Sequence, residues 1–317
     1  MRMTKRFSLF AAAAAFTAST AVLAAPTFIN VLTGGTSGVY YPIGVALSQL
    51  YSNGIEGSKT SVQATKASVE NLNLLQAGRG ELAFALGDSV ADAWNGVEDA
   101  GFKAPLSKLR AIAGTYPNYI QIVASKESGI TTLADLKGKR ISVGAPKSGT
   151  ELNARAIFKA AGLSYEDMGK VEFLPYAESV ELIKNRQLDA TLQSSGLGMA
   201  AIRDLAATLP ITFVAIPAEI TAKIDNAAYQ AASIPAGTYD GQDSDVPTVA
   251  ITNILVSHDG VSDEVAYQMT KLMFDNLERL GNAHSAAKDI KLEGAAKGLP
   301  IPLHPGAERF YKEAGAL

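Results

Sequence analysis

Residues 140–161 read RISVGAPKSGTELNARAIFKAA, and the pattern of this stretch predicts the fold of much of the chain. Its first five residues are typical of a strand, and the apolar spacing from Glu151 onward is typical of a helix. A turn that contains Gly144 and Gly149 joins the two. The same order of strand, glycine-rich turn and helix is found at residues 28–51. Strands that alternate with helices predict an α/β fold, in which helices cover both faces of a mostly parallel sheet.

Two similar series of strands and helices predict two lobes. We expect strands 28–32, 60–65 and 82–86 with helices 39–51 and 69–77 in the first series, and strands 140–144, 171–174 and 190–193 with helices 151–161 and 180–185 in the second. A short echo supports the repeat, because Ser68-Val69-Glu70 and Ser179-Val180-Glu181 each open a helix that leads to a strand.

Two long apolar stretches, 109–124 and 248–257, are rich in β-branched residues, and we expect them to cross between the lobes. Lobe 1 would then comprise residues 25–120 and 252–317, and lobe 2 residues 121–251, with a ligand cleft between them.

The returning segment contains an expected helix over 263–280, with Ser262 at its N-cap and Gly281 after its last turn. Five apolar residues share one stripe of this helix, and we expect them in the core: Val265, Met269, Leu272, Met273 and Leu280.

The composition fits a globular protein of about two domains, since the chain has 317 residues, 47% of them apolar and 19% charged. Lys and Arg total 28 against 31 Asp and Glu, so no basic excess is present to neutralise phosphates, and we expect no nucleic-acid partner. The chain has no cysteine, which excludes disulfides, thiolate metal sites, catalytic thiols and a lipidated N-terminal cysteine.

The first 24 residues have the pattern of a secretory signal peptide. Three basic residues among the first six precede an apolar, alanine-rich run over 7–23, and Val22 and Ala24 lie at positions −3 and −1 of a cut after Ala24. The alternative is a membrane anchor, but a run of about 17 weakly hydrophobic residues is short for a bilayer. We therefore expect segment 1–24 to be removed, leaving a soluble monomer in the periplasm with a net charge of −3 − 3 = −6.

The turn over residues 144–150 is similar to a phosphate-binding P-loop in its glycine spacing. Thr150 stands where the P-loop lysine should follow the second glycine, so we do not expect nucleotide hydrolysis. Free backbone N–H groups at a helix N-terminus still make an anion site, and the hydroxyls of Ser148 and Thr150 add donors beside Gly149. The alternative is that Thr150 only caps the helix.

A second glycine-rich turn, residues 33–42, also joins a strand to a helix. Gly35 allows a ligand to approach the backbone, Thr36 and Ser37 supply hydroxyl donors, and Tyr40 or Tyr41 can form one wall. Alternatively, the tyrosines belong to the core and the glycines only shape the turn. We expect ligand contact from both glycine-rich turns, because both would face one crevice at the carboxyl ends of the strands.

Polar residues follow two further strands. Asp88 either caps a helix or faces the cleft, and Gln193 with Ser194 and Ser195 would line the same crevice. We expect Arg155 to pair with Glu151, four residues earlier, rather than with a ligand.

Catalytic residues are not indicated. None of the three histidines has the spacing of a zinc helix, and no Gly-x-Ser-x-Gly elbow is present. His304 lies in a proline-rich turn, where a structural hydrogen bond is expected. We therefore expect no catalytic residue, no metal and no cofactor.

Five stretches together carry a resemblance to a known family: GGTSGVYYP (34–42), SVENL (68–72), SGTELNAR (148–155), IPAGTY (234–239) and IPLHPGA (301–307). They resemble the TAXI family of solute-binding receptors for tripartite ATP-independent periplasmic (TRAP) transporters, over essentially the whole mature chain. LADLKGK (133–139) is a broader mark of two-lobed periplasmic receptors.

The resemblance implies a type II periplasmic-binding-protein fold whose two lobes, joined by two crossing strands, clamp a ligand and deliver it to TRAP membrane permease subunits. Family ligands are small carboxylates, including dicarboxylates, 2-oxo acids such as 2-oxoglutarate, and acidic amino acids such as glutamate. Many relatives carry Gln-Ser-Asp where this chain has Leu86-Gly87-Asp88, which weakens the case for a glutamate-type ligand. The alternatives are an exported two-lobed enzyme that acts on a small anion, and a sensory module that presents a ligand to a membrane kinase.

Overall fold

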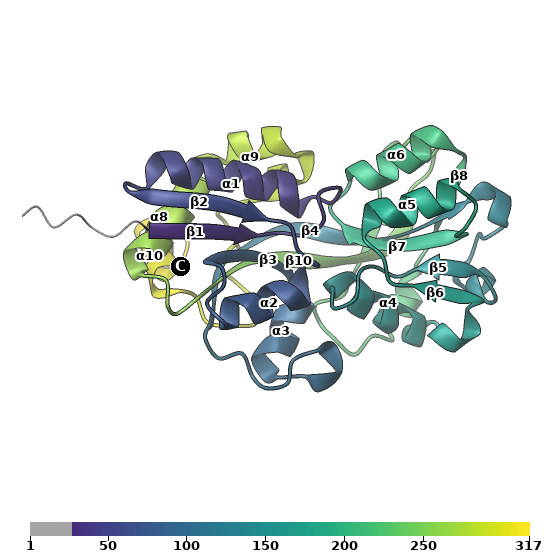
Figure 1. Ribbon diagram of the computed structural model, residues 1–317, viewed down its shortest axis with the longest axis horizontal. Coiled ribbons are helices and arrows are strands. Elements are labelled where there is room, and N and C mark those ends of the chain that lie inside the picture. The colour runs from purple at the N-terminus through teal and green to yellow at the C-terminus, as the bar shows by residue number, and fades with distance from the viewer. Residues whose placement is uncertain (1–26) are drawn as a thin grey trace, which may run out of the picture.

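The computed structural model describes residues 27–317, in which ten strands form one sheet (Figure 1). The strands are β1 (Thr27–Leu32), β2 (Ser58–Gln63), β3 (Leu82–Leu86), β4 (Leu109–Ser125), β5 (Arg140–Ser142), β6 (Lys170–Glu172), β7 (Ala190–Ser195), β8 (Ile211–Val214), β9 (Gln230–Ile234) and β10 (Val246–His258). The predicted signal peptide, residues 1–24, lies outside the described residues.

Ten α-helices accompany the strands in the described part of the chain. They are α1 (Tyr40–Gly54), α2 (Ser68–Gln76), α3 (Gly87–Asn95), α4 (Gly149–Ala160), α5 (Tyr176–Lys184), α6 (Ala200–Thr208), α7 (Ala218–Thr221), α8 (Asp263–Phe274), α9 (Leu277–Ala283) and α10 (Pro305–Glu313). The strand and helix positions of both expected series are confirmed, with boundaries that shift by a few residues.

The strand order is β2-β1-β3-β10-β4-β7-β5-β6. From either edge of the sheet, the second strand of a lobe comes first, followed by its first strand, its third strand and one long central strand. Strands β1, β2 and β3 are parallel, as are β5, β6 and β7, whereas the two central strands run antiparallel to their neighbours. We name the half that holds β1–β3 lobe 1 and the half that holds β5–β7 lobe 2. Each lobe therefore repeats one order, strand–helix–strand–helix–strand–helix, on its own side of β10 and β4.

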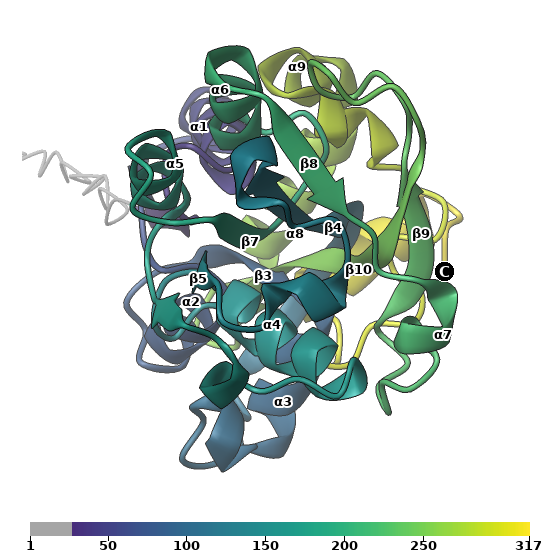
Figure 2. The same cartoon turned by 90° about the vertical axis from the view of Figure 1, so that its right-hand side faces the viewer.

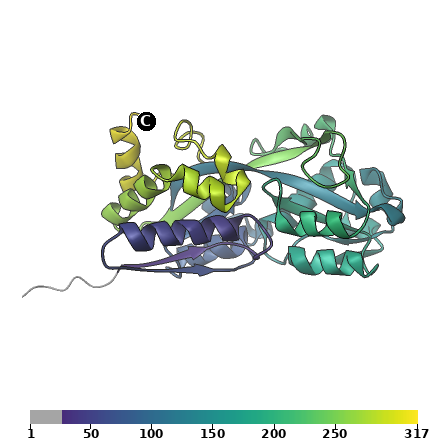
Figure 3. The same cartoon turned by 90° about the horizontal axis from the view of Figure 1, so that it is seen from above.

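The long strands β4 and β10 connect the lobes, as predicted. The first part of β4 pairs with β10, and its last part pairs with β7 and β8. At the junction, Tyr119 of β4 is in register with Ala250 of β10 on one side and Ser195 of β7 on the other. Figure 3 shows these strands passing between the two groups of helices, and Figure 2 shows β8 and β9 beside them.

Helices pack on both faces of each lobe (Figure 1). One core cluster takes residues from α1, α8 and α10 in lobe 1 and from α5 and α6 in lobe 2. On the opposite face, α2 and α3 pack over lobe 1, and α4 packs over lobe 2. This arrangement leaves the starts of α1, α2, α4 and α5 facing the gap between the lobes.

The helix predicted over 263–280 is wrong in one respect, because the structure divides it into α8 and α9. Ser262 caps α8 as expected, and its Oγ accepts a hydrogen bond of 3.3 Å from the Val265 amide. The chain then turns at Asn276, whose φ is −130° and whose side-chain amide donates to the Leu272 carbonyl over 2.8 Å. An asparagine that satisfies a carbonyl in this way competes with the helix. Gly281 consequently lies within α9 rather than after the last turn.

Candidate ligand site

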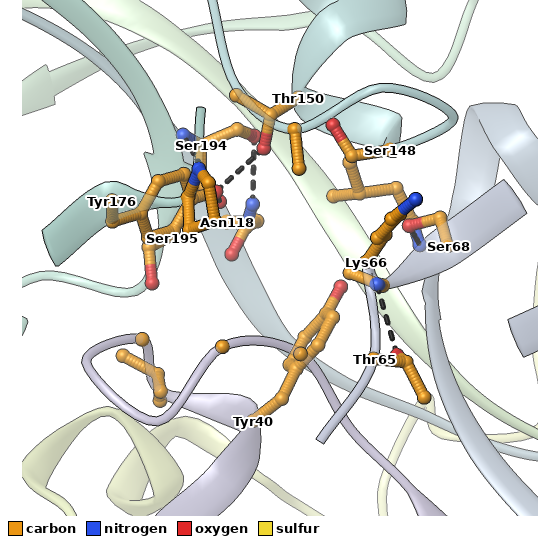
Figure 4. A pocket seen from close by; sticks show the side chains of 18 residues that line it. Tyr40, Thr65, Lys66, Ser68, Asn118, Ser148, Thr150, Tyr176, Ser194 and Ser195 are labelled. Atoms are coloured by element: carbon orange, nitrogen blue, oxygen red, sulfur yellow. Dashed lines mark hydrogen bonds between the residues drawn. The ribbon is translucent and has the colours of Figure 1, made fainter. Parts of the chain in front are cut away.

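A cavity of about 120 Å³ lies between the lobes, where strand-to-helix turns of both lobes meet (Figure 4). Equivalent turns contribute from each side. Lobe 1 supplies Gly34, Gly35, Gly38, Val39, Tyr40, Thr65, Lys66, Ala67, Ser68 and Leu86, lobe 2 supplies Ala145, Ser148, Thr150, Pro175, Tyr176, Ser194 and Ser195, and Asn118 comes from β4. The two glycine-rich turns therefore face one cavity.

Four helices begin at this cavity, two from each lobe. Tyr40 opens α1 and Ser68 opens α2, while Ser148 caps α4 and Tyr176 opens α5. The first amide groups of a helix have no partner within it, and the helix dipole adds partial positive charge at the same end. Four such ends around one cavity favour an anionic group of a ligand.

The turn before α4 is shaped by its glycine and its serine. Gly144 has a φ of +93°, a conformation that suits glycine, and a Cβ there would lie 2.7 Å from the Thr150 side chain. The Ser148 Oγ accepts a hydrogen bond of 3.2 Å from the Glu151 amide, so Ser148, not Thr150, is the cap of α4. Because Ser148 accepts in this bond, its own hydroxyl proton remains available to a ligand.

Thr150 and Tyr176 line the lobe 2 side of the cavity, at the top and at the left of Figure 4. Their hydroxyl oxygens lie 2.5 Å apart, and Tyr176 donates to the Ser194 carbonyl over 2.7 Å. Since the Tyr176 proton is used there, the Thr150 hydroxyl donates to Tyr176. Burial raises the pKa of Tyr176 and of Tyr40, so both phenols are neutral at physiological pH.

A buried chain of hydrogen bonds leads from the cavity to Asp88. It runs from Tyr40 to Asn253 (2.6 Å), Asn118 (3.3 Å), Ser194 (2.8 Å), Asn153 (2.8 Å) and Asp88 (2.8 Å). Each member donates to the next, so all the dipoles point away from the cavity and toward the carboxylate. The chain starts and ends in lobe 1 but passes through both crossing strands and through β7 and α4 of lobe 2.

Asp88 is buried, with 2% of its surface exposed, and is neither an N-cap nor part of the cavity lining. Its carboxylate accepts from Asn153 and from the Tyr229 hydroxyl over 2.7 Å, and also from the Ser89 amide. Burial raises the pKa of Asp88 to about 6, against the lowering effect of these hydrogen bonds. The alternative of a helix cap is wrong, because α3 already begins at Gly87 and Leu86 occupies the N-cap.

The other predicted site residues divide between the lining and its surroundings. Gly35, Tyr40, Ser148 and Thr150 line the cavity, as do Ser194 and Ser195. Thr36 and Ser37 lie in the same turn as Gly35 but outside the lining; Thr36 is exposed, and the Ser37 carbonyl accepts from the Ala201 amide of lobe 2 over 3.4 Å. Arg155 pairs with Glu151 at 2.7 Å, as predicted.

Gly149 and Gln193 lie behind the cavity wall. A Cβ on Gly149 would lie 2.7 Å from the Ser68 Oγ and 2.7 Å from the Leu86 side chain, so this glycine permits close approach of α4 to lobe 1. Gln193 is fully buried in β7, and its amide nitrogen lies 3.5 Å from the Tyr176 carbonyl.

Lys66, Asn118 and Tyr176 line the cavity and were missed by the sequence reasoning. Lys66 and Tyr176 each stand at the strand-to-helix turn of their lobe, before or at the start of α2 and α5. Their position at these turns could have predicted that they line the cavity, because in a parallel sheet every strand-to-helix turn that follows a carboxyl end lies at the same edge as the glycine-rich turns. Asn118 gave no comparable signal, since it lies within an apolar strand.

His304 lies outside the cavity lining. His304 caps α10, accepting from the Gly306 amide over 3.3 Å, and its other ring nitrogen lies 3.0 Å from the Val261 carbonyl, which confirms a structural role. Within residues 27–317, no group of three or more metal-ligating side chains gathers. No helix in that range is long and apolar enough to span a bilayer.

Comparison with known proteins places this fold among two-lobed periplasmic binding proteins. PhnD1 from Prochlorococcus marinus in complex with methylphosphonate matches with a TM-score of 0.56 and 10% identity, over 92% of this chain and 100% of that one. A binding-protein component of an ABC phosphonate transporter from Pseudomonas aeruginosa matches with a TM-score of 0.54 and 12% identity, over 84% and 80%. The alkanesulfonate-binding protein SsuA from Xanthomonas axonopodis, bound to MOPS, matches with a TM-score of 0.50 and 16% identity, over 91% and 84%.

The fold and the cavity between its lobes define the class as a two-lobed periplasmic-binding-protein fold of mixed α/β type. At the level of sequence, a model described as the NMT1-like family matches residues 31–315, and the chain belongs to this family.

Proposed function

We propose that this protein is an extracytoplasmic solute-binding receptor that captures a small organic anion between its lobes and delivers it to a membrane permease. The observation that carries the proposal is the convergence of four helix N-termini, two from each lobe, on one cavity. An anion held there would interact with both lobes at once, and this differential interaction would favour the closed conformation.

The ligand is a small carboxylate: a dicarboxylate, a 2-oxo acid or an acidic amino acid. Backbone amides and the free Ser148 proton supply hydrogen bonds to a charged acceptor, each worth about 1.5–3 kcal/mol. Three or four of them support binding near the micromolar range, roughly −8 kcal/mol, after the cost of association. Sulfonates and phosphonates, which bind the structural neighbours, present similar acceptor oxygens and belong in the same screen.

The partner is a TRAP-type permease, which the resemblance of five stretches to TAXI receptors supports. The Pseudomonas aeruginosa neighbour serves an ABC transporter but shares only the fold with this chain. Reconstitution of the receptor with its permease in proteoliposomes distinguishes a TRAP-type permease from an ABC transporter. We expect uptake of the ligand when an ion gradient is the only energy source. Uptake that requires ATP would contradict a TRAP-type partner.

The lobes comprise residues 25–120 with 252–317, and residues 121–251, and β4 and β10 form the hinge. Removal of segment 1–24 releases the protein as a monomer into the periplasm. The two crossing strands support the proposed division into lobes, and the signal pattern at the N-terminus supports the proposed export.

The test places a negative charge at a helix cap. Ser148→Asp preserves the cap of α4, because aspartate caps helices as well as serine does, but it repels an anion in the cavity. We expect the Kd of the ligand found in a calorimetric screen of carboxylates, sulfonates and phosphonates to rise about 100-fold, which corresponds to roughly 3 kcal/mol.

Ser262→Asp is the matched control, since Ser262 caps α8 through the same kind of bond and does not line the cavity. Both variants should keep the melting temperature of the unliganded protein. Unchanged affinity in Ser148→Asp, or chemical conversion of the bound anion detected by NMR, would contradict the proposed function.

A further inference from the structure

The cavity lining carries a positive formal charge and no negative one. Among the 18 residues that line it, none is Asp, Glu or His, and Lys66 is the one residue with a formal charge. The phenols of Tyr40 and Tyr176 are neutral, because burial raises their pKa. Together with the four helix N-termini, the lining therefore presents positive potential without a carboxylate.

Lys66 lies across the cavity from Tyr176, beside Ser68 (Figure 4). Its side chain is exposed, and it also lines the neighbouring groove with Lys147 of lobe 2. The Glu70 carboxylate is engaged with the Lys66 backbone amide over 2.6 Å. None of the ion pairs formed by the described residues includes the Lys66 ammonium, so this ammonium can accept a ligand carboxylate as its partner.

Asp88 does not supply the missing negative charge. It lies two residues after Leu86 of the lining, but its carboxylate is buried and accepts from Asn153, Tyr229 and its own neighbour Ser89. A ligand ammonium in the cavity would thus meet positive helix ends and no carboxylate, and an ion left without a partner in a desolvated site is strongly disfavoured.

Resting on the proposed function, we propose that the ligand is an organic dianion without an ammonium group, which places one carboxylate at the helix N-termini and pairs its second anionic group with Lys66. This selects 2-oxo dicarboxylates and simple dicarboxylates over acidic amino acids. Because Lys66 lies beside Ser68 and across the cavity from Tyr176, the second anionic group then lies on the lobe 1 side, and Lys66 acts as the specificity-determining residue for the second charge.

The experiment is isothermal titration calorimetry at pH 7.5 with matched ligands. Dicarboxylates of three to six carbons are each compared with the monocarboxylate of the same length, and 2-oxoglutarate is compared with glutamate. We expect the best dicarboxylate to bind about tenfold more tightly than its monocarboxylate, and 2-oxoglutarate at least about tenfold more tightly than glutamate, as a single charge-assisted contact allows. Lys66→Gln should abolish the advantage of the dianion over the monocarboxylate of the same length.

Lys103→Gln is the control, because Lys103 is an exposed lysine of the neighbouring groove outside the cavity lining. A dianion preference that survives in Lys66→Gln, or glutamate binding as tightly as 2-oxoglutarate, overturns this inference and leaves the proposed function standing. If wild-type protein binds no carboxylate, sulfonate or phosphonate at all, the proposed function fails, and the inference fails with it.

Discussion

Asp88 illustrates how a single side chain acquires its role from residues far away in the sequence. Its carboxylate accepts from Asn153 and Tyr229, which are 65 and 141 positions further along the chain. The hydrogen-bond chain from Tyr40 ends on it with every donor pointing the same way. A negative charge at the end of such a chain favours this orientation of all its members, and buried networks of this kind are sensitive to the loss of one partner.

The buried carboxylate predicts a specific pH dependence. The pKa of Asp88 is raised from 3.8 to about 6, chiefly by burial, with Asp92 adding to the increase and Tyr229 opposing it. Between about pH 4 and pH 6 the folded protein therefore binds a proton that the unfolded chain has lost, so the Asp88 contribution to stability falls as the pH rises through this window. The free energy of unfolding of Asp88→Asn, minus that of wild type, should increase from pH 4 to pH 6 and stay constant above. Urea unfolding at several pH values measures this difference, and a flat difference would contradict the assignment.

Sequence reasoning was strongest for residues whose role is local. Ser148 lies in a turn whose glycines and hydroxyls already indicate a helix start, and His304 lies in a rigid turn and caps the helix that follows it. Gln193 and Asp88 could not be placed in this way, because whether a polar side chain at a strand end faces the cavity or the protein interior depends on what packs over it. For Asp88 that covering comes from α4 and from Tyr229, both of lobe 2.

At the scale of elements, the starts of α4 and α2 approach each other across the gap between the lobes. Gly149 of α4 is the point of contact, since a Cβ there would lie 2.7 Å from the Ser68 Oγ and 3.0 Å from the Ser68 Cβ. The glycine-rich motif thus has two uses: it exposes backbone amides, and it removes a side chain where the lobes meet.

Gly149→Ala should therefore oppose closure. The added methyl group separates the lobes by a few tenths of an ångström or more, so we expect ligand affinity to fall about tenfold. The unliganded protein should keep its stability, because Gly149 is the first residue of α4 and the lobes can separate to accommodate the methyl group. Calorimetry and thermal unfolding measure the two effects. Ala160→Gly is the control, because it exchanges the same two residue types at the other end of α4, away from the contact with Ser68. An unchanged affinity in Gly149→Ala would show that the contact does not govern closure.

The element pattern could be read from the sequence with one exception. Alternating strands and helices, and the two long crossing strands, follow from hydrophobic periodicity. The break between α8 and α9 does not, because apolar spacing continues through it and the interruption depends on the local bond of Asn276 to the Leu272 carbonyl. A single asparagine within a periodic helix gives too weak a signal to predict such a break.

At the scale of the whole molecule, the two halves of the sheet are joined by paired strands and by a few polar contacts across the gap. The bond from Tyr229 of lobe 2 to Asp88 of lobe 1 is one of these contacts. Because this bond joins the two lobes, we expect it to contribute to the free energy that favours closure.

Tyr229→Phe should shift the population toward open forms. Removal of this donor leaves the buried carboxylate less satisfied in the closed state, so we expect the ligand Kd to rise about fivefold to tenfold and the radius of gyration of the unliganded protein in small-angle scattering to increase. Tyr165→Phe is the matched control, because the Tyr165 hydroxyl donates to Glu151 within lobe 2 over 2.9 Å. Equal effects of the two substitutions would argue against a role between the lobes.

The route of the chain through β4 and β10 places β1 and the C-terminal residue on the same lobe (Figure 1). The chain thus leaves lobe 1, forms lobe 2 and returns to lobe 1. A tag fused at Leu317 would therefore move with lobe 1 only. Because the sequence contains no cysteine, Leu317→Cys together with Asn185→Cys on the exposed rim of lobe 2 would introduce the sole two thiols for a pair of dyes. Energy transfer between those dyes would report the distance between the lobes, and thereby ligand binding, in real time.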